Sequence, residues 1–365
     1  MGRRWRLLRR TCRAAGAAIA PLTALVLLAG PEPPPGSVRP ASLARARYLM
    51  GARLTIEASG SEAAAAIEAA FGEVERLDSA LSNWRDDSEI VALNRRAGEQ
   101  PFLCSSDLAA VVGAALHWAE ETGGAFDPTV EPLVRRLGLR GREGRLPGVP
   151  AEAAVSSPAE EGRSSAPAPI DPWGWRLVRF DRARGTIRFE APGVGLDLGG
   201  IGKGYALDAA LRVLVAHGVE SALLDFSGQI LVYGRGPDDG GWRVGVTGPD
   251  NRDRPREVIR IASGSLASSG NGERSVRGAR GPIGHILDPA TGRPAGFDGT
   301  VTVLAADGVT ADALSTALFV MGPEHGTAWA VAHHFDVVYF WRGPGGAPER
   351  SGAGRFADGA AGVAP

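Results

Sequence analysis

The spacing of apolar residues changes along the chain between a strand-like period of two and the helical period of about 3.6. Residues 53–57 alternate as in a strand, and Ser59 with Glu62 forms a capping-box pattern before an alanine-rich segment. Helical spacing predicts helices over 63–77, 107–122, 203–216, 311–321 and 324–334, with a short helix ending near Asn94. Short apolar runs predict strands over 173–180, 186–190, 221–226, 229–233, 242–247, 257–262, 301–305 and 337–341.

These helices and strands are interleaved, but they do not follow the regular strand–helix–strand order of a parallel sheet. The order therefore predicts an α+β or mixed α/β fold built as one compact unit. The 40 basic and 41 acidic residues nearly cancel, so nothing in the charge indicates a nucleic-acid partner. Cys12 lies in a predicted targeting segment and leaves Cys104 as one thiol, which excludes a disulfide framework within one chain.

Segments of biased composition flank and interrupt this unit. Residues 1–30 place five arginines before a mostly apolar run, which is typical of a secretory signal peptide or signal anchor. Residues 31–45 read as a proline-rich linker. The Gly-, Pro- and Ala-rich residues 140–169 and 343–365 predict a disordered insertion and a disordered tail. The folded domain is thereby predicted over 46–342.

A glycine-rich turn at 195–208 is the strongest candidate for a ligand loop. It reads as a strand end, a tight turn containing Gly199 and Gly202, and the first turn of a helix that carries Lys203. Free amides at a helix start bind anions, so a phosphate or pyrophosphate would suit this position. The spacing matches neither a P-loop nor a dinucleotide fingerprint. The alternative is an ordinary strand-to-helix turn with packing glycines.

Two further clusters carry residues suited to chemistry. Asp312 and Thr316 lie four apart on a predicted helix, with Ser315 between them, and hard oxygen ligands on one helix face suit Mg²⁺. The alternative is a solvated acidic helix start. His285 and Asp288 stand three apart before a Pro-x-x-Gly turn, which a capping aspartate on a surface turn would also explain. The polar residues 268–274 are predicted to form a loop.

Taken together, these stretches resemble the ApbE family, the bacterial FAD:protein FMN transferases. No single stretch is specific, but their combination in this order is. The matching motifs are Met50-Gly51, residues 81–84 and 87–90 with Asn94, residues 124–130, 196–204 and 268–270, residues 285–289 with 291–292, and residues 311–314 with Thr316.

The resemblance implies a single ApbE-like, T-fold-like α+β domain with a mainly antiparallel sheet and packed helices. It implies that FAD is the substrate, that Mg²⁺ is the cofactor, and that FMN passes to a Thr or Ser hydroxyl of an acceptor protein with release of AMP. Carried over by motif, His285 and Asp288 fall at the reacting end and Gly202, Asp312, Ser315 and Thr316 at the metal. Flavin-nucleotide contacts fall on Met50, Trp84, Ala125, Phe126, Asp127, Gly199, Lys203, Tyr205 and Leu287.

The resemblance also implies acceptors with a D-G-x-[ST]-[AG]-T motif, such as subunits of membrane electron-transfer complexes. With the signal-like N-terminus, we expect an exported protein in the periplasm or on the outer face of the inner membrane. Trp84 stands where the family often has Tyr, Gly202 replaces a frequent Ala, and Ser227-Gly228-Gln229 replaces the usual Gly-Gly-Asp. The alternatives are an FAD pyrophosphatase, which gives FMN and AMP, and a non-catalytic FAD-binding protein.

Overall fold

The structure is a computed structural model that describes residues 42–139, 172–237, 240–249, 254–270, 275–278 and 281–358. The predicted signal segment and the predicted insertion at 140–169 lie outside these residues, as does most of the predicted linker. Within the described residues, no helix combines the length and the apolar character needed to cross a membrane.

One eight-stranded sheet forms the centre of the fold, with the strand order β1-β2-β6-β7-β10-β15-β16-β17. Each neighbouring pair is antiparallel, which confirms the predicted α+β class with a mainly antiparallel sheet. The strands are β1 Ser42–Leu49, β2 Ala52–Ser59, β6 Ser221–Phe226, β7 Gln229–Tyr233, β10 Gly264–Gly270, β15 Gly299–Ala305, β16 Asp336–Arg342 and β17 Pro348–Ala353.

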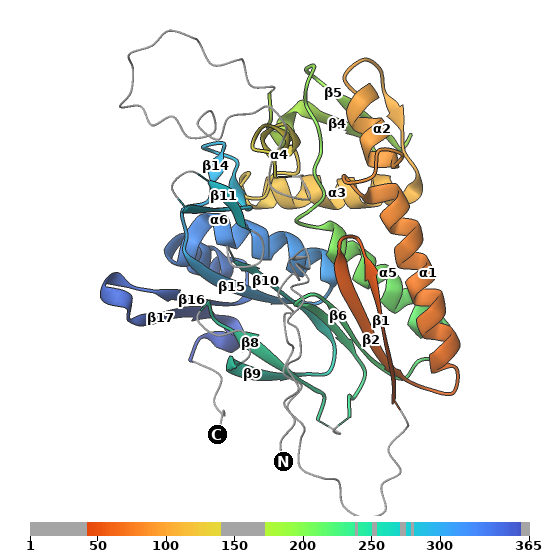
Figure 1. Cartoon of the computed structure of the whole chain (residues 1–365), viewed down its shortest axis with the longest axis vertical. Coiled ribbons are helices and arrows are strands. Elements are labelled where there is room, and N and C mark those ends of the chain that lie inside the picture. The colour runs from red at the N-terminus through yellow and green to blue at the C-terminus, as the bar shows by residue number, and fades with distance from the viewer. Residues whose placement is uncertain are drawn as a thin grey trace, which may run out of the picture.

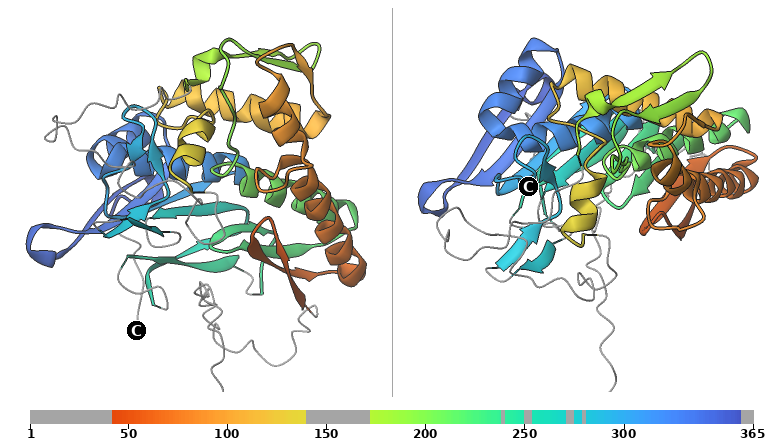
Figure 2. Two further views of the ribbon diagram at one scale, coloured as in Figure 1. Left: turned by 45° about the horizontal axis from the view of Figure 1, so that its top comes forward. Right: turned by 90° about the horizontal axis from the view of Figure 1, so that it is seen from above.

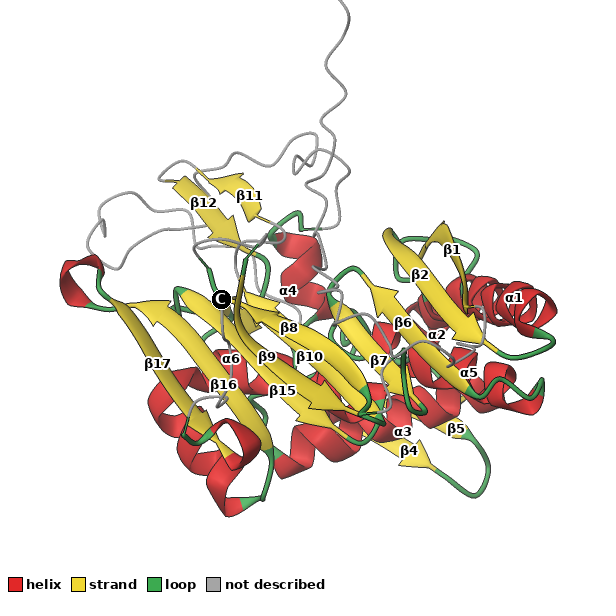
Figure 3. Cartoon of the chain, turned by 90° about the horizontal axis from the view of Figure 1, so that it is seen from below, coloured by secondary structure: helices red, strands yellow, loops and turns green. Residues whose placement is uncertain are grey.

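The long helices cover one face of this sheet, and a β-hairpin covers the other (Figures 1 and 3). The helices bury alanine, leucine and valine side chains against the sheet, so the core lies between these two layers. The helices are α1 Ala63–Leu81, α3 Ser106–Glu121, α5 Gly202–Ala216 and α6 Gly308–Ala332. The hairpin consists of β8 Trp242–Thr247 and β9 Pro255–Ile261, and it encloses a second apolar cluster.

Smaller elements complete the domain beside α3. A three-stranded sheet in the order β3-β5-β4 lies next to α3, away from the main sheet (Figure 2). These elements are α2 Glu89–Arg96, β3 Phe102–Leu103, α4 Glu131–Arg136, β4 Val178–Asp181 and β5 Thr186–Phe189, with the 3-10 turn η2 Trp175–Leu177 before β4. The remaining short elements are β11 Ser275–Gly278, β12 Gly281–Gly284, β13 Leu287–Asp288, β14 Arg293–Pro294, η3 Pro344–Gly346 and η4 Gly354–Phe356.

Several predicted elements need correction. Ser59 is the last residue of β2, and Glu62 caps α1 without a side-chain hydrogen bond, so the capping box is wrong. Part of the predicted linker, from Ser42 onward, belongs to β1. The predicted loop at 268–274 begins inside β10, which ends at Gly270.

The predicted disordered tail is also wrong for residues 343–358. These residues contain β17, which pairs with β16 along its whole length. Phe356 follows β17 and is fully buried in the cluster that includes Val338 and Phe340. Residues 343–358 are rich in glycine and alanine, but their backbone pairs with β16 and Phe356 is buried.

The two helices predicted at 311–321 and 324–334 form the single element α6 with a break inside it. Gly322 takes the non-helical angles φ 74° and ψ 175°, and Pro323 follows. Proline cannot donate the helical hydrogen bond, and glycine tolerates positive φ, so the break falls where the sequence places both residues.

Candidate functional site

Two asparagines hold the strand-like stretch that leads into the glycine turn. Asn94 donates to the Leu196 carbonyl at 2.9 Å and accepts from the Leu196 amide at 2.7 Å. Asn83 donates to the same carbonyl at 2.8 Å and accepts from the Leu198 amide at 3.1 Å. The stretch has no neighbouring strand in the described sheets, so these side chains and the Pro128 carbonyl supply its backbone partners.

The glycine turn packs directly against residues predicted to bind FAD or metal. A Cβ atom added at Gly200 would lie 3.0 Å from Thr316 Oγ1 and 3.2 Å from a ring carbon of Phe126. A Cβ atom at Gly202 would lie 3.7 Å from the Met50 methyl group. Met50 reaches this place from the β1–β2 turn, where its φ is 46°. The turn thus brings together predicted site residues from four parts of the chain.

Asp312 is the polar centre of this group. Its side chain is 6% exposed, and its Oδ1 lies 3.2 Å from the Lys203 ammonium. Its Oδ2 accepts a hydrogen bond of 3.0 Å from the Gly204 amide in the first turn of α5. Ile201, the N-cap residue of α5, makes no side-chain cap, so α6 supplies the acceptor that the start of α5 lacks.

Asp208 makes the reverse contact from α5 to α6. Its two carboxylate oxygens accept from the amides of Gly308 at 2.7 Å and Val309 at 2.9 Å. Burial raises the pKa of this carboxyl to about 6, although both amide hydrogen bonds act to lower it. Gly204 and Gly308 meet between the two caps, where a Cβ atom at Gly204 would lie 2.1 Å from the Gly308 carbonyl oxygen.

Hydroxyl groups extend the oxygen-rich face of α6. Ser315 Oγ is buried within 2.9 Å of Ser269 Oγ and also donates to the Asp312 carbonyl at 2.9 Å. Thr316 Oγ1 donates to the same carbonyl at 3.3 Å.

This donor set fits Mg²⁺. A carboxylate and hydroxyls are hard oxygen ligands, and Mg²⁺ usually takes one or two protein carboxylates and completes its shell with water and substrate phosphates. The Lys203 ammonium lies 3.2 Å from Asp312 Oδ1, so a metal ion bound here would share the carboxylate with this lysine. The described residues contain no group of three or more His, Cys, Asp or Glu suited to a metal, so a dedicated multi-carboxylate cage is not what they offer. Gly202, whose carbonyl was predicted as a ligand, is the first residue of α5.

Gln229 lies next to the same helix start. Its side chain is 3% exposed, and its Nε2 donates to the Gly308 carbonyl at 3.0 Å. Within the described residues, its Oε1 is the buried side-chain atom that has no hydrogen-bond partner. An acceptor left this way costs about 1–3 kcal/mol.

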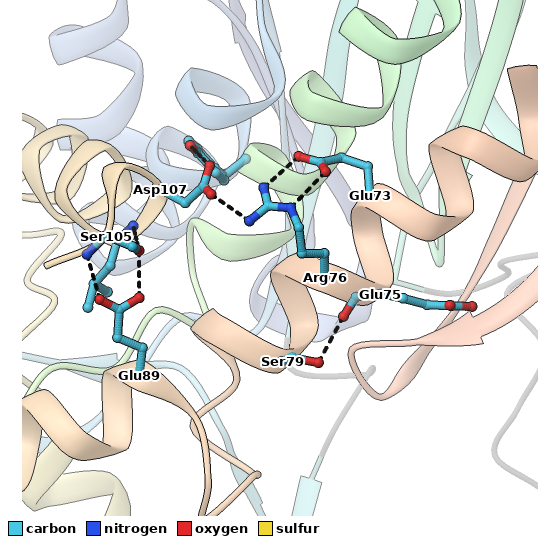
Figure 4. A network of polar contacts seen from close by, with 9 residues as sticks. Glu73, Glu75, Arg76, Ser79, Glu89, Ser105 and Asp107 are labelled. Atoms are coloured by element: carbon cyan, nitrogen blue, oxygen red, sulfur yellow. Dashed lines mark hydrogen bonds and ion pairs between the residues drawn. The ribbon is translucent and has the colours of Figure 1, made fainter.

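The hydroxyl of Tyr205 contacts α3. Its hydroxyl donates to Asp107 Oδ1 at 2.8 Å, and burial together with that hydrogen bond raises its pKa to about 12. Figure 4 shows the other partner of Asp107, the Arg76 guanidinium, which also contacts Glu73. The hydroxyl of Tyr205 therefore links α5 to α3 and, through Asp107 and Arg76, to α1. The predicted contact with flavin would be made by the ring of Tyr205.

Asp127 was predicted to contact the flavin, but its carboxylate already accepts three hydrogen bonds from within the chain. Oδ1 accepts from the amide of Thr129 at 2.8 Å and from its hydroxyl at 2.6 Å, and Oδ2 accepts from the Trp175 amide at 3.0 Å. Burial raises the pKa of Asp127, although these hydrogen bonds act to lower it. Phe126 is buried and Ala125 is half-buried beside it, whereas Trp84 is 55% exposed and offers a free aromatic surface.

The predicted reacting residues lie at β13: His285 precedes the strand, and Asp288 is its last residue. Asp288 caps its own turn, because Oδ1 accepts from the Ala290 amide and Oδ2 from the Thr291 hydroxyl, both at 2.9 Å. Leu287 is buried and pairs with Pro294, and His285 is half-buried just before it. Each oxygen of Asp288 thus accepts one hydrogen bond within its own turn.

Sequence reasoning missed several of these contacts. The roles of Asn83, Asn94 and Asp208 were not predicted, nor was the contact between Gly204 and Gly308. Gly204 and Gly308 each stand four residues before the aspartate that caps the other helix, but the same spacing also separates Gly123 from Asp127 and Gly193 from Asp197, so it is not a specific signal.

Comparisons with known proteins show what the chain as a whole is similar to. A sequence profile of the ApbE family matches residues 50–340. An FAD:protein FMN transferase of Treponema pallidum is 31% identical over 309 residues, which cover 80% of this chain and 82% of that protein. Another from Vibrio cholerae is 29% identical over 87% of this chain and 91% of that protein.

Solved structures show the same similarity. The ApbE protein of Thermotoga maritima superposes with a TM-score of 0.73 at 29% identity and covers 85% of this chain and 97% of that one. The flavin transferase ApbE of Vibrio cholerae superposes with a TM-score of 0.71 at 26% identity and covers 87% of this chain and 98% of that one.

Proposed function

The chain belongs to the ApbE family, and from that premise we propose that it is a Mg²⁺-dependent FAD:protein FMN transferase. The observation that carries the proposal is the position of Asp312. Its buried carboxylate joins Lys203 and Gly204 at the glycine turn, beside the hydroxyl face of α6. An amide-lined helix start with a lysine and a cation-binding carboxylate suits a diphosphate.

In the proposed reaction, a Thr or Ser hydroxyl of an acceptor protein attacks the phosphorus of the FMN half of FAD. A new phosphoester P–O bond forms, the P–O bond of the diphosphate bridge breaks, and AMP leaves with the bridging oxygen. The hydroxyl proton passes to the His285 imidazole. Mg²⁺ held by Asp312 and Thr316 would neutralise the diphosphate charge, and positioning with charge neutralisation supplies most of phosphoryl-transfer catalysis.

The chain's own residues would divide the remaining work. The amides of the glycine turn and Lys203 would hold the diphosphate. Trp84 and Phe126 offer aromatic surface for the flavin or adenine ring. The acceptors we propose carry a D-G-x-[ST]-[AG]-T motif, and the basic and then apolar N-terminus supports action outside the cytoplasm.

The test mixes the purified full-length protein with FAD, Mg²⁺ and an acceptor domain that carries the motif. Flavin fluorescence that stays on the acceptor after denaturation, with AMP released, would support transfer, and EDTA should abolish both. FMN and AMP without a labelled acceptor would instead indicate the pyrophosphatase. FAD that stays bound and intact would indicate a binding protein.

Two aspartate variants separate metal binding from folding. Asp312→Asn should lower the transfer rate by about 100-fold or more and remove its response to Mg²⁺. Asp208→Asn is the matched control, because it alters the equivalent cap on the partner helix without touching the proposed metal face. Equal losses in both variants would mean that Asp312 acts through the helix joint and not as a metal ligand.

A further inference from the structure

The proposed site has two halves that the chain builds from distant segments. One half is the glycine turn with Asp312, and the other is the turn of His285–Gly292. The short strands β13 and β14 pair with each other and not with the main sheet. Something other than the sheet ladder must therefore fix the second half relative to the first.

Ile286 and Ala295, on the two sides of the turn, pack in one apolar cluster with Leu314 of α6. Trp173 adds a polar connection to the turn itself. Its indole Nε1 donates to the Pro289 carbonyl at 2.8 Å. The ring also covers Gly292, where an added Cβ would lie 3.1 and 3.2 Å from two ring carbons and 3.5 Å from Leu133 of α4. Gly292 has φ 66°, so this closely packed position is one that favours glycine. Figure 1 shows β14, which follows this turn, beside α4.

The segment that carries Trp173 is tied in turn to the first half. The Gly174 amide donates to Thr129 Oγ1 at 2.6 Å, and the Trp175 amide donates to Asp127 Oδ2 at 3.0 Å. The Asp197 amide, just before the glycine turn, donates to the Pro128 carbonyl at 2.7 Å. An unbroken series of contacts thus runs from the glycine turn through residues 127–129 to Trp173 and on to the turn of His285–Gly292.

We propose that Trp173 is a positioning residue for group transfer, because its indole sets the place of the His285–Gly292 turn relative to the glycine turn. The inference rests on the proposed function. The first half would hold the diphosphate of FAD, whereas His285, the proposed acceptor of the hydroxyl proton, belongs to the second half. A shift between the halves therefore changes the rate of the transfer step and leaves FAD binding largely as it is. Small misplacements of this kind are known to have large effects on rate.

The test compares two tryptophan variants of the full-length protein. Trp173→Phe keeps an aromatic ring but removes the Nε1 donor. Trp242→Phe is the matched control, since Trp242 is 4% exposed and its Nε1 donates in the same way to the Tyr233 carbonyl at 3.1 Å, in the β8–β9 hairpin. The readouts are kcat, KM for FAD and the melting temperature of each variant.

We expect Trp173→Phe to lower kcat about tenfold with KM for FAD changed less than twofold, a rate effect in the range that misorientation produces. Trp242→Phe should change the melting temperature as much as Trp173→Phe does and should leave kcat unchanged. An unchanged kcat in Trp173→Phe, or an equal kcat loss in both variants, would overturn the proposal. If the wild-type protein transfers no FMN while it binds FAD, the proposed function fails first and this inference falls with it.

A second pair of variants checks that the effect passes through the turn. Gly292→Ala introduces a Cβ against the indole, so it displaces the turn from the other side of the same contact. The kcat loss of the double variant Trp173→Phe/Gly292→Ala should be smaller than the product of the two single losses. Losses that multiply would show two independent effects and count against the proposal.

Discussion

Asp208 and Asp312 cap each other's helices: Asp208 of α5 accepts from the first amides of α6, and Asp312 of α6 accepts from the Gly204 amide of α5. The exchange requires the two helix starts to lie almost in contact, which the absence of side chains at Gly204 and Gly308 permits. A single carboxylate, Asp312, thus serves both the helix joint and the proposed cation site.

Gly204→Ala should reduce the free energy of unfolding by about 3 kcal/mol or more, because the new methyl group would overlap backbone atoms that cannot move aside. The added Cβ would lie 2.1 Å from the Gly308 oxygen and 2.8 Å from the Val309 nitrogen. Urea denaturation measures the change. Gly72→Ala in α1 is the control, since nothing lies within 4 Å of its Cβ position and alanine should stabilise that helix by about 0.5–1 kcal/mol. A mild effect at Gly204 would show that the helices separate easily.

Asp208→Asn should change how stability depends on pH. The folded pKa of Asp208, about 6, lies above the usual value of 3.8, so its contribution to stability is fully present below about pH 4 and is lost as the pH rises through 6. The wild type should therefore lose up to about 3 kcal/mol relative to the variant between these pH values. Denaturation curves at pH 4 to 7 measure the difference.

Asp87→Asn provides a control of opposite sign for that experiment. Hydrogen bonding to Arg85 and its charge hold the pKa of the exposed Asp87 carboxyl below its usual value. Its contribution is present at neutral pH and is lost as the pH falls through the folded pKa. If both aspartate variants shift the pH profile in the same direction, burial is not what controls Asp208.

Gln229→Met should change the free energy of unfolding by less than about 1 kcal/mol, although it removes a buried hydrogen bond. The lost donation to the Gly308 carbonyl is offset because the unpartnered Oε1 disappears as well. Ser265→Ala is the comparison, since that fully buried hydroxyl donates to the Ile230 carbonyl at 2.9 Å and should cost about 1 kcal/mol. A loss above about 2 kcal/mol for Gln229→Met would indicate that Oε1 has a bound partner in solution.

Phe356→Ala should destabilise the protein by about 3–5 kcal/mol, because the ring is fully buried and alanine leaves a cavity. The ring belongs to the same apolar cluster as Trp242 of the covering hairpin. Thermal and urea denaturation measure the loss. Leu103→Ala, at a side chain 71% exposed, should stay within about 0.5 kcal/mol. A negligible effect at Phe356 would contradict the placement of the C-terminal segment against the sheet.

The sequence predicted best where side-chain periodicity decides the structure. The strands β6, β7 and β8 were predicted residue for residue, because each buries a continuous or alternating set of apolar side chains. It predicted poorly where polar residues are buried in pairs. Ser268 and Ser269 read as a loop, yet they lie in β10 because their hydroxyls find Thr302 and Ser315. A partner that distant in the sequence leaves no local signal.

The site shows the same division. The glycine turn and the pair Asp312 and Thr316 were predicted from local spacing, and the structure brings them together. The capping role of Asp208 was not predictable, because its acceptor function depends on amides 100 residues away in the sequence. The anchoring of Trp173 to Pro289 spans 116 residues and is equally invisible to pattern analysis.

The cap exchange between α5 and α6 also sets an order of events during folding. Gly204 and its acceptor Asp312 are separated by 108 residues, so closing that loop costs entropy before any contact repays it. During synthesis the glycine turn is made long before the carboxylate that completes it. The growing chain therefore cannot form the proposed cation site until α6 has been made, and a nascent chain that stops short of α6 would carry the turn with its first helix uncapped.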